Sequence, residues 1–179
     1  PAFRWTKDAK VTAAIHTAAP VLIEKNGNDI TRNDWRLTFK TLFNMATDSG
    51  HFIDHEEVAP LIKERRGALA VLYDGREVYP LYEGKMFWHF DHRYGTYENQ
   101  TEKQANKGVL PRVPDEMHSA PDYQIQPRYW VDARLTKETL AGDAGAPWLF
   151  SWRDVGPSER TFIGTVLPLT AMGHASPYL

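Results

Sequence analysis

The chain has 179 residues, a length that suits one domain or a fragment of a longer chain. A formal net charge of −2 excludes bulk attraction to nucleic acid, so any such binding must use a local patch. With no cysteine in the sequence, disulfides, thiolate zinc sites and cysteine nucleophiles are excluded together. We expect a cytoplasmic protein, since cysteine is absent and no run approaches the roughly 18 apolar residues of a membrane helix. Because the first residue is Pro1, we expect an excised piece of a longer polypeptide.

Short elements are expected at the start of the chain. The segment 11–19 can form a short helix that Pro20 ends. A short strand at 21–23 precedes the turn sequence Asn-Gly-Asn-Asp at 26–29. Alternating apolar residues at 35–39 then predict a half-buried strand.

A longer helix is predicted to start after Asp54, whose carboxylate suits an N-cap. Acidic residues follow in the first turn, and Lys63, Arg65 and Arg66 would occupy the last turn, which complements the helix dipole. Gly67 is expected to end this helix.

The strongest hairpin signal is Asp74-Gly75, which separates apolar segments at 68–73 and 76–81. Further strands are predicted at 128–134, 148–152 and 161–167. The fold expected for the whole of residues 1–179 is therefore α+β, with a twisted antiparallel or mixed sheet and a few short helices. The aromatic residues expected in its core are Trp35, Phe39, Trp130, Trp148 and Phe150.

Residues 98–127 are polar and rich in proline, which predicts a long loop. A connection of this length is uncommon in a compact domain unless it is functional or disordered. Its asparagine, glutamine and lysine side chains at 99–107 are suited to hydrogen bonds with bases and phosphates.

The stretch 80–97, PLYEGKMFWHFDHRYGTY, mixes aromatic rings with charges of both signs. His89, Asp91 and His92 within it are metal-ligand types. On a strand His92 would point away from the other two, and on a helix Asp91 would, so the three cannot converge on regular structure. Hydrogen-bonded polar residues are the favoured interpretation, and no metal is expected.

Sequence motifs give little support to catalysis within this chain. Nucleophile-elbow and phosphate-loop motifs are absent. A magnesium-dependent nuclease would need paired carboxylates and a lysine, which Asp74, Glu83 and Lys85 could supply. This nuclease remains an alternative, as does a protein-interaction module.

Nucleic-acid readout is the favoured function, because arginine can bind guanine or phosphate with two hydrogen bonds. The candidate DNA-binding residues lie in the 80–97 stretch and on or beside the later strands. They are Lys85, His89, His92, Arg93, Tyr94, Arg128, Arg153 and Arg160.

Four segments in the same order resemble large bacterial adenine-specific DNA methyltransferases of type IIG restriction-modification systems and of BREX- or DISARM-type phage defence. The stretch 80–97 is similar to their PLYEGKM…FDHR…Y pattern, and WRLTFKTLFNMATDSGHF at 35–52 to their W…F…F-x-M-x-x-D-S-x-x-F pattern. The sequence RYWV at 128–131 and the FSWRD…ERT…LP segments between 150 and 168 complete the resemblance.

The resemblance implies that catalysis lies elsewhere in a longer parent chain. Methylases of this family bind S-adenosylmethionine and carry an Asn/Asp-Pro-Pro-Tyr/Phe motif, whereas the nearest sequence here is Ala-Ser-Pro-Tyr at 175–178. The chain would then be part of the target-recognition region, without a cofactor of its own, and would not be an enzyme by itself. Its implied partners are double-stranded DNA, the methylase domain of the same parent and other defence-system proteins, with no membrane.

Overall fold

The computed structural model describes residues 5–19, 21, 23–34, 41–140, 147–153 and 162–173. The chain divides into two compact units, Pro1–Thr38 and Phe39–Leu179. In these described ranges no helix is both long enough and apolar enough to cross a bilayer. The strand predicted at 35–39, with the core candidates Trp35 and Phe39, lies outside the described residues.

The first unit consists of one helix and one hairpin. Helix α1 spans Thr6–Ala18, which confirms a helix before Pro20. Strands β1 (Glu24–Asn26) and β2 (Asp29–Arg32) pair in antiparallel fashion around the predicted turn. Gly27 in this turn has a φ of +62°, a left-handed conformation that glycine adopts without steric cost. The first strand thus starts at Glu24, later than the predicted range 21–23.

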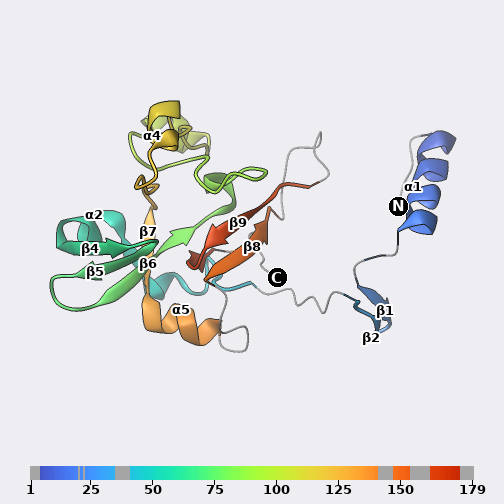
Figure 1. The fold of residues 1–179 in the computed structure, drawn as a ribbon, viewed down its shortest axis with the longest axis horizontal. Helices are drawn as coiled ribbons and strands as arrows, with labels where there is room; N and C mark the ends of the chain where they lie inside the picture. The colour runs from blue at the N-terminus through green and yellow to red at the C-terminus, as the bar shows by residue number, and fades with distance from the viewer. Residues whose placement is uncertain are drawn as a thin grey trace. The chain divides into compact units, whose positions relative to one another are not determined.

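The second unit is built on a mixed sheet, and the predicted α+β class is confirmed (Figure 1). Neighbouring strands of its main path are antiparallel, while the last short strand pairs in parallel with the central one. The path runs β3 (Phe52–Asp54), β7 (Tyr129–Asp132), β6 (Glu77–Tyr82), β5 (Leu69–Leu72) and β4 (Ile62–Arg66), and β10 (Ala171–Met172) joins β6.

The helix predicted between Asp54 and Gly67 is wrong beyond its first turn. Helix α2 covers only His55–Val58 and continues as the 3-10 turn η2 (Ala59–Leu61) into strand β4. Pro60 has no amide hydrogen to donate, which ends the α-helical pattern. The basic residues assigned to the last helical turn instead lie on β4, which pairs with β5 across a turn at Gly67.

The hairpin predicted at Asp74-Gly75 is confirmed. Gly75 has a φ of +86°, and the Arg76 amide donates to the Asp74 carboxylate at 3.0 Å. The amide of Leu72 donates to the carbonyl of Arg76 at 2.8 Å and closes the turn. Local turn chemistry thus positions β5 beside the central strand β6.

The strands predicted at 148–152 and 161–167 are present as β8 (Trp148–Trp152) and β9 (Gly164–Pro168), and they form a separate antiparallel ribbon. One face of β8 buries Leu149, while the other carries Trp148, Phe150 and Trp152. The core prediction for Trp148 is wrong, because 51% of it is exposed, and Phe150 is half-buried. Tryptophan at an alternating position is equally compatible with the outer face of a two-stranded ribbon.

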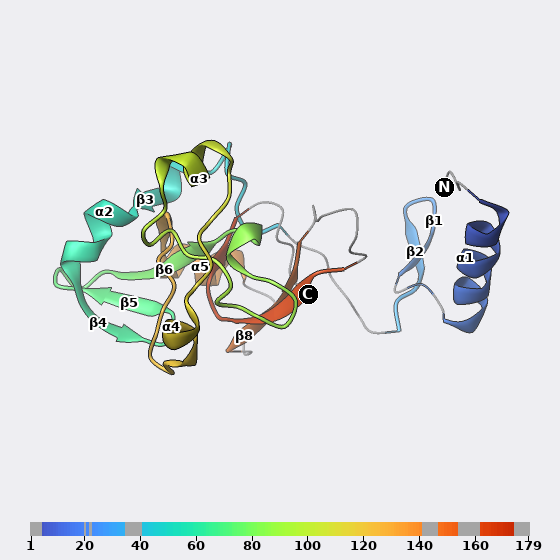
Figure 2. The same ribbon diagram turned by 90° about the horizontal axis from the view of Figure 1, so that it is seen from above.

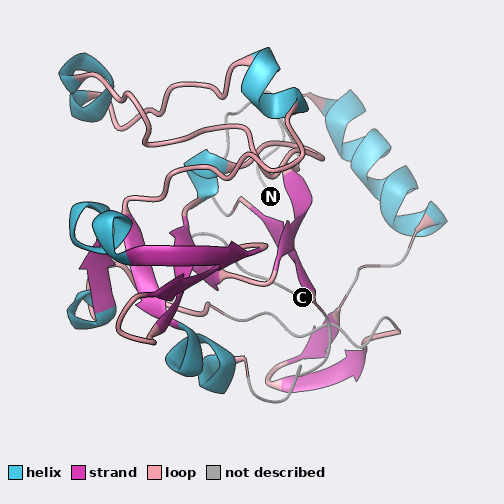
Figure 3. Cartoon of the chain, turned by 60° about the vertical axis from the view of Figure 1, so that its left-hand side comes forward, coloured by secondary structure: helices cyan, strands magenta, loops and turns pink. Residues whose placement is uncertain are grey.

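The predicted loop 98–127 contains two short helices, α3 (Glu102–Asn106) and α4 (Asp115–Ser119). The Gln104 amide donates to the Thr101 hydroxyl, and the Gln104 side chain accepts from the Thr101 amide, which forms a capping box for α3. Figure 1 shows α4 on one side of the sheet and α5 (Ala133–Thr139) on the other, and Figure 3 shows the same arrangement in a turned view; Figure 2 looks onto α3 and α4 from above.

Two apolar clusters stabilise the unit. The larger cluster lies between the sheet, the β8–β9 ribbon and the 80–97 stretch, and its members include Leu81, Phe87, Val131, Leu167 and Met172. In the smaller cluster, Val58, Ala70, Leu72 and Val78 surround Trp130, which is fully buried as predicted. The 80–97 stretch is therefore anchored in the core at Leu81 and Phe87.

Candidate nucleic-acid interface

The 80–97 stretch leaves β6, passes through the 3-10 turn η3 (Gly84–Met86) and reverses in a tight turn at 88–91. The Trp88 amide donates to the Asp91 carbonyl at 2.7 Å, and the Asp91 amide donates back to the Trp88 carbonyl at 3.0 Å. His89 and Phe90 form the tip of this turn, and both are exposed. The stretch thus combines a buried start with a protruding aromatic tip.

Trp88 and Tyr94 stack on each other with their ring centroids 5.1 Å apart. The Cζ of Arg153 lies 4.6 Å from the Trp88 centroid, and the Cζ of Arg112 lies 5.1 Å from the Tyr94 centroid. Arg153 also donates from Nε to the carbonyl of Phe87 at 3.1 Å. We call Trp88, Tyr94, Arg112 and Arg153 the arginine–ring stack. It includes two predicted site residues, Tyr94 and Arg153, together with Arg112, which was not predicted.

Lys85 and Arg128, although distant in sequence, line one cavity at the end of the sheet. This sheet-end cavity has a volume of about 550 Å³, and its wall also contains the amide side chains of Gln100 and Gln126. The amide of His55 donates to the carbonyl of Arg128 at 2.9 Å, which fixes the start of β7 beside the end of β3. The 98–127 excursion thus supplies one wall of a polar cavity, and the end of β3, helix α2 and Lys85 supply the other, which includes the carboxylates of Asp54 and Glu56.

Lys85 is only partly free for a ligand. Its ammonium lies 3.3 Å from the Glu83 carboxylate and 5.0 Å from the centroid of the Tyr97 ring. The Tyr97 hydroxyl donates to the same carboxylate at 2.5 Å. Burial, together with this hydrogen bond to Glu83, raises the pKa of the Tyr97 hydroxyl, which therefore stays protonated at neutral pH. The described contacts leave Arg128, which is exposed, as the less encumbered cation of the cavity.

Arg93 is half-buried and directed toward main-chain carbonyls. Its Nη1 donates to Ala120 at 2.7 Å and to Tyr123 at 3.4 Å, and its Nη2 donates to His118 at 2.7 Å. These bonds tie the end of α4 to the 80–97 stretch. Arg93 is consequently a weaker candidate for DNA contact than Arg128.

The histidines of the stretch have different surroundings. His89 packs against Phe90, with ring centroids 4.0 Å apart, while Asp91 accepts a contact from His118 Nε2 at 3.0 Å. Burial and the neighbouring Arg93 charge lower the pKa of His92. In the described part of the chain, no group of three or more histidine, aspartate and glutamate side chains is placed to hold a metal ion.

Two partly buried histidines, His55 and His92, should make stability depend on pH. Burial and then the Arg65 charge lower the pKa of His55, whose Nδ1 accepts from Trp130 Nε1 at 3.1 Å. With a lowered pKa, His55 binds protons more readily in the unfolded chain than in the folded one. Its contribution to stability is therefore fully present above pH 6.5, the pKa in the unfolded chain, and is lost as the pH falls below that value. Urea unfolding between pH 7 and pH 5 should show this decline.

Two variants separate the contributions to this pH dependence. His55→Gln should flatten the decline, and the double variant His55→Gln/His92→Gln should flatten it further, since both histidines have a lowered pKa. An unchanged slope in the double variant would show that other groups dominate the acid response.

The nuclease alternative requires Asp74 and Glu83 to share one metal ion. They lie beyond opposite ends of the six-residue strand β6, which at ~3.3 Å per residue spans about 20 Å. The amide and side chain of Arg76 occupy the Asp74 carboxylate and lower its pKa. This arrangement does not form a two-carboxylate site with Lys85.

Apart from Arg93, the arginines that the structure describes in the second unit show two kinds of environment. In one kind, a neighbouring carboxylate neutralises the guanidinium: Arg66, Arg76 and Arg134. In the other kind, the guanidinium lies over an aromatic ring: Arg65, Arg112, Arg128 and Arg153. Within the described ranges none of these ring-stacked arginines makes an ion pair. No carboxylate neutralises their charge in these ranges, although Arg153 also donates to the Phe87 carbonyl.

Two of the ring-stacked arginines, Arg128 and Arg153, were predicted from the sequence. Arg112 lies in the proline-rich segment that was interpreted as a loop, where no local pattern places it beside Tyr94. Arg65 was assigned to a helix, whereas its position on β4 places it over Trp130 at 5.0 Å from the ring centroid. The predicted site residue Arg160 lies outside the described residues.

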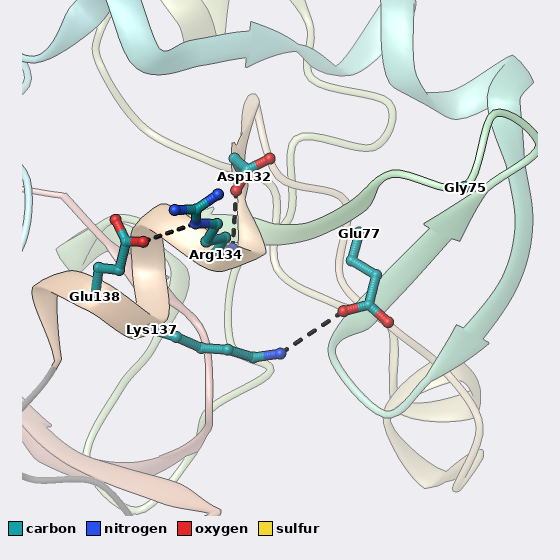
Figure 4. A pocket seen from close by; sticks show the side chains of 6 residues that line it. All are labelled: Gly75, Glu77, Asp132, Arg134, Lys137 and Glu138. Atoms are coloured by element: carbon teal, nitrogen blue, oxygen red, sulfur yellow. Dashed lines mark hydrogen bonds and ion pairs between the residues drawn. The ribbon is translucent and has the colours of Figure 1, made fainter.

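A second surface depression, between the β5–β6 turn and α5, is lined by charges that neutralise each other (Figure 4). Lys137 contacts Glu77 at 3.6 Å, and Arg134 contacts Glu138 at 2.7 Å. Exposed pairs of this kind contribute little to binding or to stability. This depression is therefore a poor candidate for an anion site.

No protein-family model matches the chain, and neither a curated protein nor a solved structure shows significant similarity to it. The resemblance to adenine-specific methyltransferases accordingly stays a prediction.

Proposed function

We propose that the chain is the target-recognition part of an S-adenosylmethionine-dependent adenine DNA methyltransferase of a restriction-modification or phage-defence system. It would read DNA sequence and position the duplex. The observation that supports this function best is the set of ring-stacked arginines without carboxylate partners. A guanidinium held against a ring loses less conformational freedom when it binds a phosphate or a guanine edge.

The sheet-end cavity adds the chemistry that readout of bases requires. Arg128 supplies a forked donor, and the side-chain amides of Gln100 and Gln126 can both donate and accept hydrogen bonds. An amide of this kind pairs with adenine, while arginine pairs with guanine. The excursion 98–127 would thus contribute recognition groups from outside the sheet.

Catalysis is assigned to another part of the parent protein. In this proposal the methylase domain of the same parent chain binds S-adenosylmethionine and transfers the methyl group to an extruded adenine. The present chain would contact that domain and duplex DNA, and other proteins of the defence system are further candidate partners.

Binding of the chain to a fluorescently labelled DNA duplex tests the proposal. We expect anisotropy to report binding that weakens steeply as salt increases, because phosphate contacts release counterions. Arg112→Ala and Arg128→Ala should each weaken binding about three- to tenfold and reduce the salt slope by about 1.

The matched control is Arg76→Ala, which removes an exposed arginine that Asp74 already neutralises. Its affinity for DNA should stay within about twofold of the unmodified chain. Salt-independent binding, no binding at all, or equal losses in all three variants would each reject DNA recognition by these arginines. If the chain binds protein partners of the methylase but has no affinity for DNA, the protein-interaction module is favoured instead.

A further inference from the structure

Phe90 has an unusual combination of conformation and exposure. It occupies the third position of the 88–91 turn with a φ of +60° and is 84% exposed. This left-handed conformation suits glycine or asparagine and is unfavourable for a bulky side chain. A ring almost wholly in water contributes little apolar burial that could offset the strain. Folding alone therefore gives no reason for phenylalanine at this position.

The turn beneath Phe90 is held rigidly. Besides the two hydrogen bonds between Trp88 and Asp91, the Phe90 amide donates to the carbonyl of Gly164 at 3.0 Å. A side chain at position 164 would collide with the Phe162 ring, since a Cβ there would lie 2.6 Å from it. Glycine thus allows Phe162 to pack close to His89, with ring centroids 6.3 Å apart. These contacts fix the backbone of the turn from which the Phe90 ring protrudes.

A guanidinium group lies beside the first residue of this turn. Trp88, the first residue of the turn, is part of the arginine–ring stack and contacts Arg153. The neighbouring acid, Asp91, is engaged by His118 and by the Arg93 amide. An exposed aromatic ring on a hydrogen-bonded turn, next to the arginine–ring stack, matches the chemistry of a DNA backbone with stacked bases beside it.

We propose that Phe90 is a wedge that inserts between stacked bases of a bound duplex and unstacks one step. The inference rests on the proposed DNA-recognition function and deepens it. Arg112 and Arg153 would hold the phosphates that flank the opened step. Unstacking next to the target would lower the cost of extruding a base toward the methylase domain.

A comparison of two labelled duplexes tests the wedge, one fully paired and one with a central abasic site. Because the abasic duplex is already partly unstacked, the unmodified chain should bind it about tenfold more tightly. Phe90→Ala should abolish this preference and leave the salt slope unchanged, since the phosphate contacts remain. A 2-aminopurine base beside the abasic site should gain less fluorescence with this variant.

Tyr73→Ala is the matched control, because Tyr73 is also an exposed aromatic residue, 72% exposed, beside a turn of the same unit. It should retain both the preference and the salt slope. Phe90→Asn supplies a second variant, which should melt at a higher temperature because asparagine tolerates a positive φ, while it still loses the abasic preference. A loss of binding that merely reflects unfolding is thereby excluded.

The outcomes separate the two proposals. If duplex binding is absent, both the recognition function and the wedge are rejected. If salt-dependent binding persists but Phe90→Ala binds both duplexes like the unmodified chain, the wedge alone is rejected. If sedimentation shows a dimer that Phe90→Ala dissociates, the tip is a self-association surface and the wedge is likewise overturned.

Discussion

An Arg93→Ala variant should unfold with a free energy about 3 kcal/mol below that of the unmodified chain. The guanidinium donates to the carbonyls of Ala120, Tyr123 and His118, and alanine leaves these acceptors without their charged donor. Urea unfolding followed by tryptophan fluorescence measures the change. Hydrogen exchange should additionally show faster exchange in α4, because Arg93 connects its end to the 80–97 stretch.

The control for Arg93 is Arg112→Ala, whose exposed guanidinium contacts only a ring in the described structure. Its expected loss of stability is at most about 1 kcal/mol. Stability of Arg93→Ala equal to that of the control would show that the three carbonyl contacts contribute little. In that case Arg93 would regain its place among the stronger candidates for DNA contact.

A Trp130→Ala variant should lose about 3–5 kcal/mol of stability, the largest effect expected from any single substitution considered. Trp130 has no exposed surface and packs against Val58, Leu72 and Val78. Its removal creates a cavity and also leaves His55 without the indole donor. Thermal unfolding by circular dichroism measures the loss.

Trp148→Ala provides the comparison, because the same side chain is 51% exposed on the ribbon. We expect a loss below about 1 kcal/mol for this variant. Trp130→Phe should fall between the two, since it retains part of the ring but not the indole hydrogen bond. Similar losses for Trp130→Ala and Trp148→Ala would contradict the burial of Trp130.

The sequence predicts those elements whose signals are local. The β5–β6 hairpin follows from Asp74-Gly75, and β7, β8 and β9 follow from short apolar or β-branched runs. The helix after Asp54 is mispredicted because acidic and basic residues in the right order satisfy a helix pattern, while Pro60 and the pairing of β4 with β5 decide otherwise. Tertiary pairing overrides local preference there.

The candidate interface is less predictable, because it depends on contacts between distant segments. Tyr94 and Trp88 belong to the 80–97 stretch, but no sequence pattern near Arg112 or Arg153 indicates which aromatic rings these arginines contact. The role of Arg93 shows the reverse case, since a basic residue among aromatic rings suggests a ligand contact until its carbonyl partners are known. Only the folded chain distinguishes these two kinds of arginine.

The pairing of β10 with β6 has a consequence for how the protein is made. Thr170 donates from its hydroxyl to the carbonyl of Pro80, and the amide of Gly173 donates to the carbonyl of Tyr82. The central strand therefore lacks part of its hydrogen bonding until residues 170–173 have been synthesised. During synthesis, the core around the 80–97 stretch therefore stays incomplete until these residues have emerged, which prolongs the exposure of its apolar side chains.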